Sequence, residues 1–421
     1  MRAATSNLLI SLVSFAAQLK PLQDHWLRGI EFDEHLLEEL HLRATATMHA
    51  LYLETIPCYA KLADELGLSE EASPDHIWDN MLFSEGLFKS YDPALLVQCD
   101  FDAMTVWLRN VSHCGAIQSS GATTLTEWID SCASQGVQID TSSGTTGQPS
   151  IVPRDEMTLA LAAGLAKDFF EKSCLAPDLS ISDYNALLVT PRVGYTGLSR
   201  FSREIARLAK SAEHAFEARS EFVTSPAWAR VMSWLDDKAR TIEPTLIVAT
   251  PFTAAMLCRE IQKAGRRPTL PKGSRLLIGG GWKTFAGQAL DFDELCALVQ
   301  GELGIRRGNV IDSYSMIECN ASMSRCVYNR YHVPPQLRPF VLDEAFKPLP
   351  LPAIGRFGFS DPLQVTFPGF FATSDIVSLT NLPCDCGRLG YSIVGSVQRA
   401  ASIPPRGCAG AFYNLMGFRR Q

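Results

Sequence analysis

Short apolar runs alternate with longer amphipathic stretches through the middle of the chain, between about residues 136 and 311. Such runs, separated by helical stretches, are typical of parallel strands that are buried on both faces. The predicted strands are 136–139, 186–190, 245–249, 275–278 and 309–311, and the predicted helices are 156–173, 198–210, 222–240, 252–264 and 285–303. The predicted fold class is therefore α/β, with mainly parallel sheets and flanking helices.

The two ends of the chain differ from this middle part. Residues 1 to about 110 lack strand alternation and are predicted to be mostly helical, for example at 32–46 and 60–66. After about residue 330, prolines precede short alternating runs at 363–367 and 376–379, which predict a smaller antiparallel β region. These changes divide the chain into a helical N-terminal region, an α/β core, a β-rich region and a C-terminal tail: 1–130, 131–330, 331–395 and 396–421.

Composition and charge exclude several classes of protein. The chain has 421 residues, and its 38 Lys and Arg against 45 Asp and Glu give a net charge of −7. A nucleic-acid-binding protein would show a basic surplus instead. With 46% hydrophobic and 20% charged residues, the composition is that of a globular protein with a large core. No apolar run reaches the roughly 18–20 residues of a membrane-spanning helix.

The apolar segment Leu8–Ala17 has two interpretations. It follows Arg2, as in a secretory signal. An amphipathic first helix is favoured, because the segment continues through Gln18 and Lys20 into further helical sequence. Twelve cysteines in a chain of this length do not make a disulfide scaffold, so reduced thiols and a cytoplasmic location are expected.

A loop rich in hydroxyl side chains and glycine follows the first predicted strand, at Asp140–Ser150. Glycine permits positive φ and a close approach of the backbone, so such a loop can present N–H groups and hydroxyls to phosphate oxygens. It lacks the spacing of a P-loop. A flexible loop is the alternative, but Asp155 can cap the next helix, and this placement favours phosphate binding. The candidate residues are Ser142, Ser143, Gly144, Thr145, Thr146 and Gly147.

Residues 142–149 resemble the phosphate loop of the adenylate-forming enzymes, the superfamily of acyl- and aryl-CoA synthetases. The extension through Ile151–Asp155 and the turn Gly279–Lys283 are most similar to its phenylacetate–CoA ligase branch. Within that branch they resemble the acyl-protein synthetases of bacterial bioluminescence and related phenazine-pathway adenylating proteins. The resemblance covers about residues 130–408. It implies the large N-terminal subdomain of the adenylate-forming fold, with 131–330 as a nucleotide-binding core that uses ATP and Mg²⁺.

The resemblance also implies roles for residues beyond the loop. In Asp312–Glu318, which is similar to the family pattern D-x-Y-G-x-T-E, Asp312 and Tyr314 would line the adenine and Glu318 would ligate Mg²⁺. A solvated glutamate beside a core tyrosine is the alternative. Asp375 would bind the ribose hydroxyls. The other residues assigned to nucleotide binding are Gly279, Gly280, Gly281 and Ser313.

The chain departs from the family pattern in several places. Ser150 stands where the phosphate loop normally ends in lysine, and Ser315 and Ile317 replace the usual glycine and threonine. The family's C-terminal subdomain, which carries a catalytic lysine, is expected to be absent or truncated. Positive charge must still stabilise the reacting phosphate. Lys283 is the first candidate and Arg399 the second, with an ordinary surface cation as the alternative for each.

The residues of the pocket for the acid are the least well defined by the sequence. Position within the family implies that it is bordered by residues that follow three predicted strands: Tyr195, Gly197, Pro251, Phe252 and Trp282. Aromatic and small residues in this mixture fit an aliphatic chain and an aryl acid equally well. Core packing is the alternative role for each aromatic residue.

Two places in the sequence have cysteines with a predicted function. Cys326, His332, Cys384 and Cys386 offer the four sulfur and nitrogen donors of a tetrahedral zinc site, with Cys319 as an alternative ligand. Similar positions hold a structural zinc in parts of the resembled branch; reduced structural thiols are the alternative. Cys408 lies between glycines near the C-terminus and matches the acyl-accepting cysteine of the acyl-protein synthetases. An incidental tail cysteine is the alternative there.

The function predicted from these features is ATP-dependent adenylation of a carboxylic acid, with transfer of the acyl group to a thiol, Cys408 or a partner protein. One alternative is an acyl- or aryl-CoA ligase or amide-forming ligase. Another is a catalytically inactive nucleotide-binding or scaffolding protein with the same fold. The expected partners are the acid and an acyl-accepting reductase or carrier, without nucleic acid or membrane; a homodimer is left open.

Overall fold

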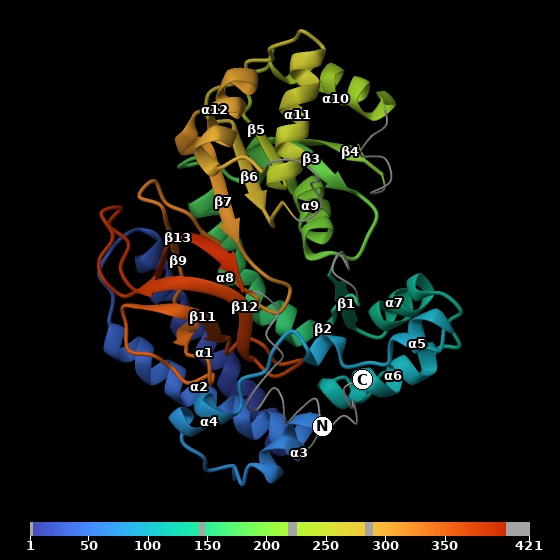
Figure 1. The fold of residues 1–421 in the computed structure, drawn as a ribbon, viewed down its shortest axis with the longest axis vertical. Helices are drawn as coiled ribbons and strands as arrows, with labels where there is room; N and C mark the ends of the chain where they lie inside the picture. Colours follow the sequence, from blue (N-terminus) through green and yellow to red (C-terminus); the bar gives the residue numbers. More distant parts are fainter. Residues whose placement is uncertain (1–2, 143–147, 218–224, 283–288, 401–421) are drawn as a thin grey trace. The chain divides into compact units, whose positions relative to one another are not determined.

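The computed structural model describes residues 3–142, 148–217, 225–282 and 289–400 (Figure 1). The chain forms two compact units. Unit 1 comprises Met1–Ala166, Met316–Ser322 and Tyr328–Gln421, and unit 2 comprises Lys167–Ser315 and Met323–Val327. Unit 1 therefore contains both the helical N-terminal region and the β-rich region. The four-part division drawn from the sequence stays a prediction.

Unit 2 is built on a six-stranded sheet with the strand order β4-β3-β5-β6-β7-β8. Its first five strands are parallel, and β8 pairs antiparallel with β7. The strands are β3 (Asn185–Pro191), β4 (Ser211–Phe216), β5 (Thr245–Ala249), β6 (Arg275–Gly279), β7 (Val310–Tyr314) and β8 (Met323–Ser324). The helical segments are η2 (Ile181–Asp183), α9 (Gly197–Leu208), α10 (Ser225–Lys238), α11 (Pro251–Lys263), α12 (Phe292–Leu303) and η4 (Arg307–Asn309).

The helices of unit 2 bury the faces of this sheet. Leu187, Ile247 and Leu276 from three neighbouring strands pack in one cluster with Val231 of α10 and Leu257 of α11. Local signals begin these helices: Thr250 caps α11 before a proline at its first position, and Asp291 caps α12. The buried parallel strands confirm the predicted α/β class.

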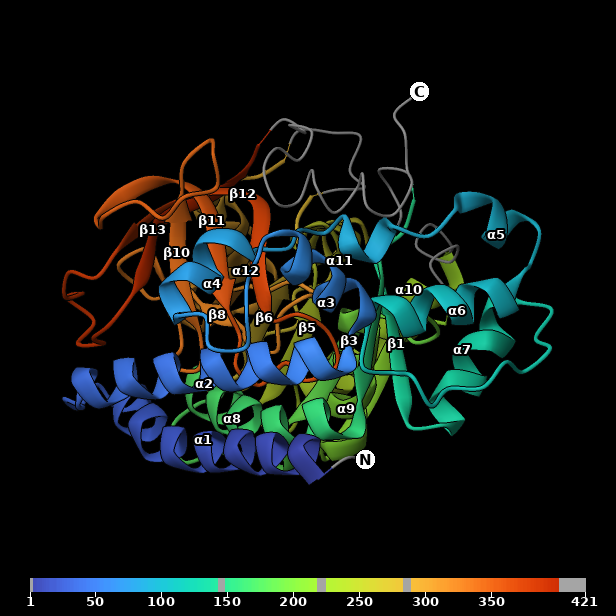
Figure 2. The ribbon, with the colours of Figure 1, turned by 90° about the horizontal axis from the view of Figure 1, so that it is seen from below.

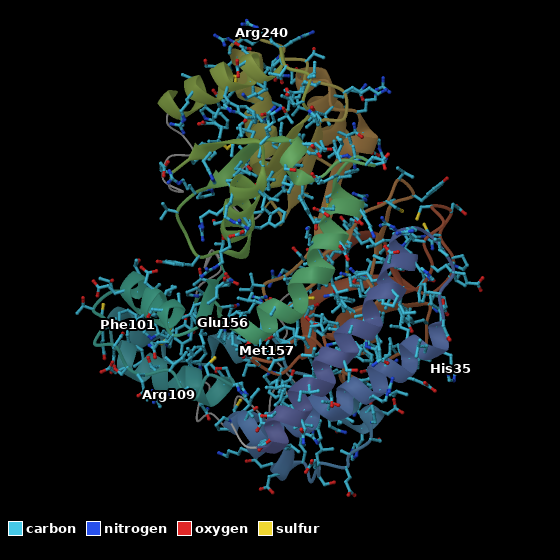
Figure 3. All side chains as sticks on the ribbon, turned by 180° about the vertical axis from the view of Figure 1, so that it is seen from behind. His35, Phe101, Arg109, Glu156, Met157 and Arg240 are labelled. Carbon is cyan, nitrogen blue, oxygen red and sulfur yellow. The ribbon has the colours of Figure 1, made fainter. Side chains whose placement is uncertain are left out.

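Unit 1 begins with a series of helices. Figure 2 shows α1 beside α2, against which it packs. The helical segments are α1 (Ala3–Leu27), α2 (Glu34–Thr55), α3 (Pro57–Glu65), α4 (Pro74–Asn80), η1 (Leu87–Lys89), α5 (Pro93–Val97), α6 (Phe101–Val111) and α7 (Leu125–Ser134). A further helix, α8 (Glu156–Cys174), starts at Glu156 (Figure 3) and runs on into unit 2.

Two antiparallel sheets complete unit 1. One is the pair β1 (Val137–Thr141) and β2 (Ile151–Asp155). The other has five strands in the order β10-β11-β12-β13-β9. Its strands are β9 (Arg330–His332), β10 (Arg338–Leu342), β11 (Ala353–Ser360), β12 (Phe370–Thr380) and β13 (Ser392–Arg399). Buried aromatic rings fill this part of the core: Phe88 packs edge-on against Phe367, and Phe359 stacks on Phe371.

The predicted elements of the middle part are confirmed with small shifts at their ends, but two predictions are wrong. Residues 363–367 form a buried loop rather than a strand, because Asp361 and Thr158 side chains accept the N–H groups of Leu363, Val365 and Thr366. Residues 289–291, predicted as helix, are not helical, since the cap at Asp291 starts the helix at 292.

Several other expectations can be compared directly. Asp155 caps α8 as predicted, accepting a 2.8 Å hydrogen bond from the N–H of Thr158. Leu8–Ala17 lies within α1. The strands β2 and β4 were not predicted. Among the described residues, no helix has both the length and the apolar character that crossing a membrane requires.

Candidate active site

The phosphate loop joins the paired strands β1 and β2, and its described flanks are held together. The N–H of Ser142 donates to the carbonyl of Ser150 at 3.0 Å, and the N–H of Ser150 donates to the Ser142 hydroxyl at 2.8 Å. Ser150 is buried and carries no charge, so this position supplies no cation to a phosphate. The other candidate residues of the loop, Ser143, Gly144, Thr145, Thr146 and Gly147, lie outside the described residues.

The second flank of the loop is held from the N-terminal region. The hydroxyl of Tyr91 donates to the carbonyl of Pro149 at 2.7 Å. The side-chain amide of Gln148 donates to the carbonyl of Tyr91 at 2.9 Å. The segment Glu85–Tyr91, which contains η1, therefore lies directly beside the C-terminal end of the loop.

Glu318 lies in a buried turn that Arg154 organises. The Arg154 guanidinium pairs with Asp140 at 2.7 Å and donates to the side chain of Asn320 at 3.0 Å. It also donates to the carbonyls of Ile317 and Cys319, on either side of Glu318. The predicted Mg²⁺ ligand is thus fixed by a cation that the extended loop motif supplies.

Glu318 is 8% exposed, and the pKa of its carboxyl is raised to about 7. Burial is the main cause, because it disfavours the ionised form, and the nearby carboxylate of Glu85 adds to it. Arg154 and Lys89 lower the pKa in part. A buried carboxyl in this state is stabilised as an anion by an added cation, so Glu318 fits the role of a Mg²⁺ ligand.

Asp375 and Arg399 are cross-strand partners on β12 and β13. Arg399 pairs with Glu85 at 3.0 Å, and the hydroxyl of Ser374 donates to the same carboxylate at 3.4 Å. Lys89 contacts Glu85 at 3.7 Å. Glu85 therefore pairs with Arg399, contacts Ser374 beside Asp375, and lies close enough to Glu318 to raise its pKa.

Unit 2 brings a second set of predicted residues to one edge of its sheet. Gly279 at the end of β6 lies opposite Ser313 on β7, and Ile278 lies opposite Asp312. Gly280 has φ +78°, which favours glycine. The residues that follow strands β3, β5 and β6 come next in the chain at this edge, where α/β sheets bind ligands. They are Tyr195, Gly197, Pro251, Phe252, Gly281 and Trp282.

The side chains at this edge already have protein partners. Asp312 pairs with Arg325 at 3.4 Å. The guanidinium of Arg200 lies 5.8 Å from the ring centre of Tyr195, and Trp282 packs against the hydrophobic core of the unit. Lys283, the first candidate for the catalytic cation, lies outside the described residues, as does Cys408.

The predicted zinc ligands form a compact group. The donor atoms of Cys326, His332, Cys384 and Cys386 all lie within 4.8 Å of one another. The Sγ of Cys386 is 3.2 Å from Nε2 of His332. The pKa of His332 is lowered to about 4, mainly by burial, so its imidazole is neutral at pH 7, as a metal ligand must be. Cys319 is not in this group; its Sγ accepts the N–H of Ala321.

The comparisons with known proteins agree with these features. Residues 219–416 match the family model described as acyl-protein synthetase, LuxE. The chain is 25% identical over 278 residues to a long-chain-fatty-acid–luciferin-component ligase of Vibrio harveyi, covering 64% of this chain and 69% of that protein. The corresponding ligase of Aliivibrio fischeri is 25% identical over 172 residues, covering 40% of this chain and 45% of that protein.

Solved structures show the same fold. An open conformation of 2-hydroxyisobutyryl-CoA ligase has a TM-score of 0.58 at 14% identity, covering 87% of this chain and 76% of that one. A second structure of this ligase, in the postadenylation state, has a TM-score of 0.56 and covers 89% of this chain and 74% of that one. The chain therefore has the fold of this acyl-CoA ligase. Its predicted resemblance to the acyl-protein synthetases is confirmed.

Three charged residues of this enzyme's candidate site were not found from the sequence: Glu85, Lys89 and Arg356. Arg356 donates to the carbonyl of Thr373 at 2.8 Å and interacts with the charges of Asp375 and Glu85. No motif surrounds Glu85 and Lys89, and they approach β12 because Phe83 pairs with Phe371 as an isolated bridge. Only the tertiary pairing reveals them.

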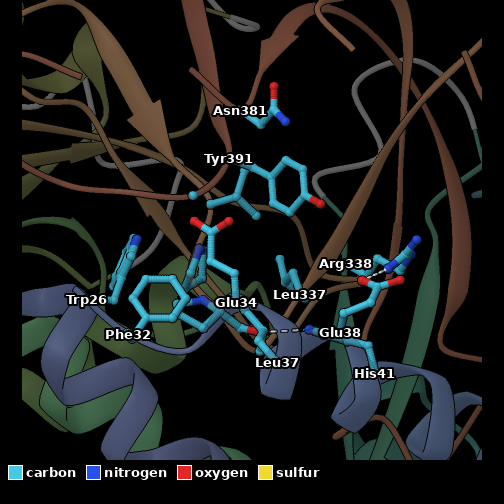
Figure 4. A pocket seen from close by; sticks show the side chains of 14 residues that line it. Trp26, Phe32, Glu34, Leu37, Glu38, His41, Leu337, Arg338, Asn381 and Tyr391 are labelled. Carbon is cyan, nitrogen blue, oxygen red and sulfur yellow. Dashed lines mark hydrogen bonds and ion pairs between the residues drawn. The ribbon is translucent and has the colours of Figure 1, made fainter. Parts of the chain in front are cut away.

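A separate cavity of about 200 Å³ in unit 1 belongs to another region of the enzyme (Figure 4). Trp26 and Phe32 line it together with Tyr391, and Glu38 pairs with Arg338 at its edge. None of the residues assigned to nucleotide or acid binding lines this cavity. We therefore place the candidate active site elsewhere.

The raised pKa of Glu318 predicts a pH-dependent effect of Glu318→Gln on stability. The Glu318 carboxyl binds its proton more tightly in the folded protein than in the unfolded chain. The free energy of unfolding therefore falls as pH rises from 4.5 to about 7. We expect Glu318→Gln to stabilise the protein by about 2–3 kcal/mol more at pH 8 than at pH 5. Urea unfolding at both pH values measures this, with exposed Glu344→Gln as control. An equal effect at the two pH values would contradict the assignment.

Proposed function

We propose that this enzyme adenylates a carboxylic acid with ATP and transfers the acyl group to a thiol. The observation that carries the proposal is the match of residues 219–416 to the acyl-protein synthetase model, because that stretch contains Glu318, Asp375 and Cys408. The gathering of Glu318, Asp375 and Arg399 around Glu85 supports it from the structure. The long-chain fatty acids named for the two curated relatives make an aliphatic acid the first substrate to test.

In the first step, a carboxylate oxygen of the acid attacks the α-phosphorus of ATP. The bond from that phosphorus to the bridging oxygen breaks, and pyrophosphate leaves with the electron pair, which forms acyl-AMP. Asp375 would accept hydrogen bonds from the ribose hydroxyls, and Asp312, Ser313 and Tyr314 would line the adenine. Mg²⁺, held by Glu318, would reduce the negative charge on the phosphates.

In the second step, a thiolate attacks the acyl carbon, and AMP leaves with the electron pair of the broken mixed anhydride. We propose Cys408 as this thiol, since it lies within the matched residues. A reductase or carrier protein would then collect the acyl group from the thioester. Tyr195, Gly197, Pro251, Phe252 and Trp282 are proposed to border the acid.

We also propose that Cys326, His332, Cys384 and Cys386 hold a structural zinc ion. Three thiolates and one neutral imidazole form a suitable tetrahedral donor set, and their separations fit one ion. Nε2 of His332 is 3.2 Å from the Sγ of Cys386, so this ring nitrogen faces the other donors. The ion would link the turn 384–386 to strand β9.

Adenylation predicts ATP–pyrophosphate exchange that depends on an added acid. In a panel of aliphatic and aryl acids, at least one should support exchange, and Glu318→Gln should lower kcat by roughly 10²–10³-fold. Glu344→Gln serves as the matched control. If the folded protein shows no exchange with any acid of the panel, the result would argue against the proposal. ATP binding without turnover would favour a nucleotide-binding scaffold.

Transfer to Cys408 predicts a covalent acyl-enzyme. Intact mass spectrometry after incubation with ATP and the active acid should show one added acyl group in the native protein and none in Cys408→Ser. The variant should retain ATP–pyrophosphate exchange, because adenylation precedes the transfer. If Cys408→Ser transfers the acyl group to coenzyme A or an amine at the native rate, the acceptor is a free molecule instead.

The zinc proposal predicts about one zinc ion per chain in protein purified from zinc-supplemented cells. Cys386→Ser and His332→Ala should lose this ion, whereas exposed Cys99→Ser should retain it. Elemental analysis measures the metal, and chelation should lower the thermal midpoint of unfolding. Metal-free protein with an unchanged midpoint would contradict the proposal.

A further inference from the structure

Lys89 is presented by an otherwise buried turn. Leu87, Phe88, Ser90 and Tyr91 are each at most 2% exposed, whereas the side chain of Lys89 is 25% exposed. Phe88 packs against Phe367 and Phe371, and Trp107 donates to the hydroxyl of Ser90 at 2.9 Å. The backbone of Lys89 is therefore held rigidly while its ammonium group reaches solvent.

The neighbours of this turn are the residues predicted to surround the phosphates. Tyr91 bonds both Pro149 and Gln148 at the end of the phosphate loop. On the other side, Lys89 contacts Glu85, which bonds Ser374 beside Asp375. The charge of Lys89 also acts on Glu318. One lysine thus lies near the phosphate loop, the Mg²⁺ ligand and the ribose-binding strand.

Two other cations of the candidate site, Arg154 and Arg399, are less suited to bind phosphate. Arg154 is buried and is already bound by Asp140, Asn320 and two carbonyls. Ser150 occupies the position at which the phosphate loop of the family carries lysine. Arg399 is 51% exposed and lies at the end of β13. Lys89 combines a fixed backbone with a side chain that can change partner.

We propose that Lys89 binds the β- and γ-phosphates of ATP and the pyrophosphate that leaves, in place of the lysine that the phosphate loop lacks. The assignment rests on the proposed adenylation. Glu85 holds the ammonium group when no nucleotide is bound. Because a partly exposed ion pair contributes only about 0–1 kcal/mol, exchanging Glu85 for a more highly charged phosphate costs little.

The test compares Lys89→Met with Lys61→Met, which removes an exposed lysine of the same unit. In ATP–pyrophosphate exchange we expect Lys89→Met to lower kcat/KM for pyrophosphate by about 100-fold and Lys61→Met to leave it unchanged. Lys89→Arg should restore part of the rate, because it retains the charge. Native-like circular dichroism and thermal midpoints establish that each variant is folded.

Binding measurements test the same assignment without turnover. Calorimetry should show an affinity for ATP about tenfold lower in Lys89→Met and an affinity for AMP, which lacks both outer phosphates, unchanged. Equal losses for ATP and AMP, or native ATP affinity, would overturn the role of Lys89. If the native protein catalyses no exchange with any acid, the proposed function fails, and the ATP and AMP affinities still decide whether Lys89 binds the phosphates.

Discussion

The buried pair of Arg154 and Asp140 is the interaction on which the unit 1 part of the site depends. A guanidinium taken out of water must be paired and hydrogen-bonded on all sides, and leaving one partner unpaired costs about 3–5 kcal/mol. Arg154 meets this requirement with two sets of partners. It binds Asp140, which precedes the phosphate loop, and it donates to two carbonyls of the turn that carries Glu318. The same cation therefore fixes the strand that leads into the loop and the proposed metal ligand.

Arg154 acts on two buried carboxyls, those of Glu318 and Asp361. Asn320 donates its backbone N–H to Asp361 at 2.9 Å, and burial raises the pKa of Asp361 to about 6. Two carboxyls thus have raised pKa values, and the charge of Arg154 lowers both pKa values in part. Full ionisation of Glu318 requires more positive charge than Arg154 provides, and a divalent cation would supply it.

Patterns local in sequence could be predicted, whereas contacts made through tertiary pairing could not. Runs such as 245–249 predict buried strands because burial on both faces demands continuous apolar residues. Asp155 predicts a helix start because its side chain can accept a hydrogen bond from a backbone N–H of the first helical turn, here that of Thr158. The predicted strand at 363–367 was wrong because the hydroxyl of Thr158, which is distant in the chain, accepts the N–H groups of Val365 and Thr366. The group of Cys326, His332, Cys384 and Cys386 could be predicted as a set, because cysteine and histidine are the usual donors of a tetrahedral zinc site.

The charged groups around Glu85 support the proposal that Lys89 replaces the lysine of the phosphate loop. Among the described residues, Lys89 and Arg399 pair with Glu85, and Arg356 interacts with the charges of Asp375 and Glu85. Glu85 alone is the partner of two of these cations, and both contacts are partly exposed, so each is weak. A polyphosphate can replace one carboxylate as the partner of two cations without the protein building any new charge. In the proposed function, cations that are paired within the protein would therefore bind phosphate when nucleotide and metal are present together.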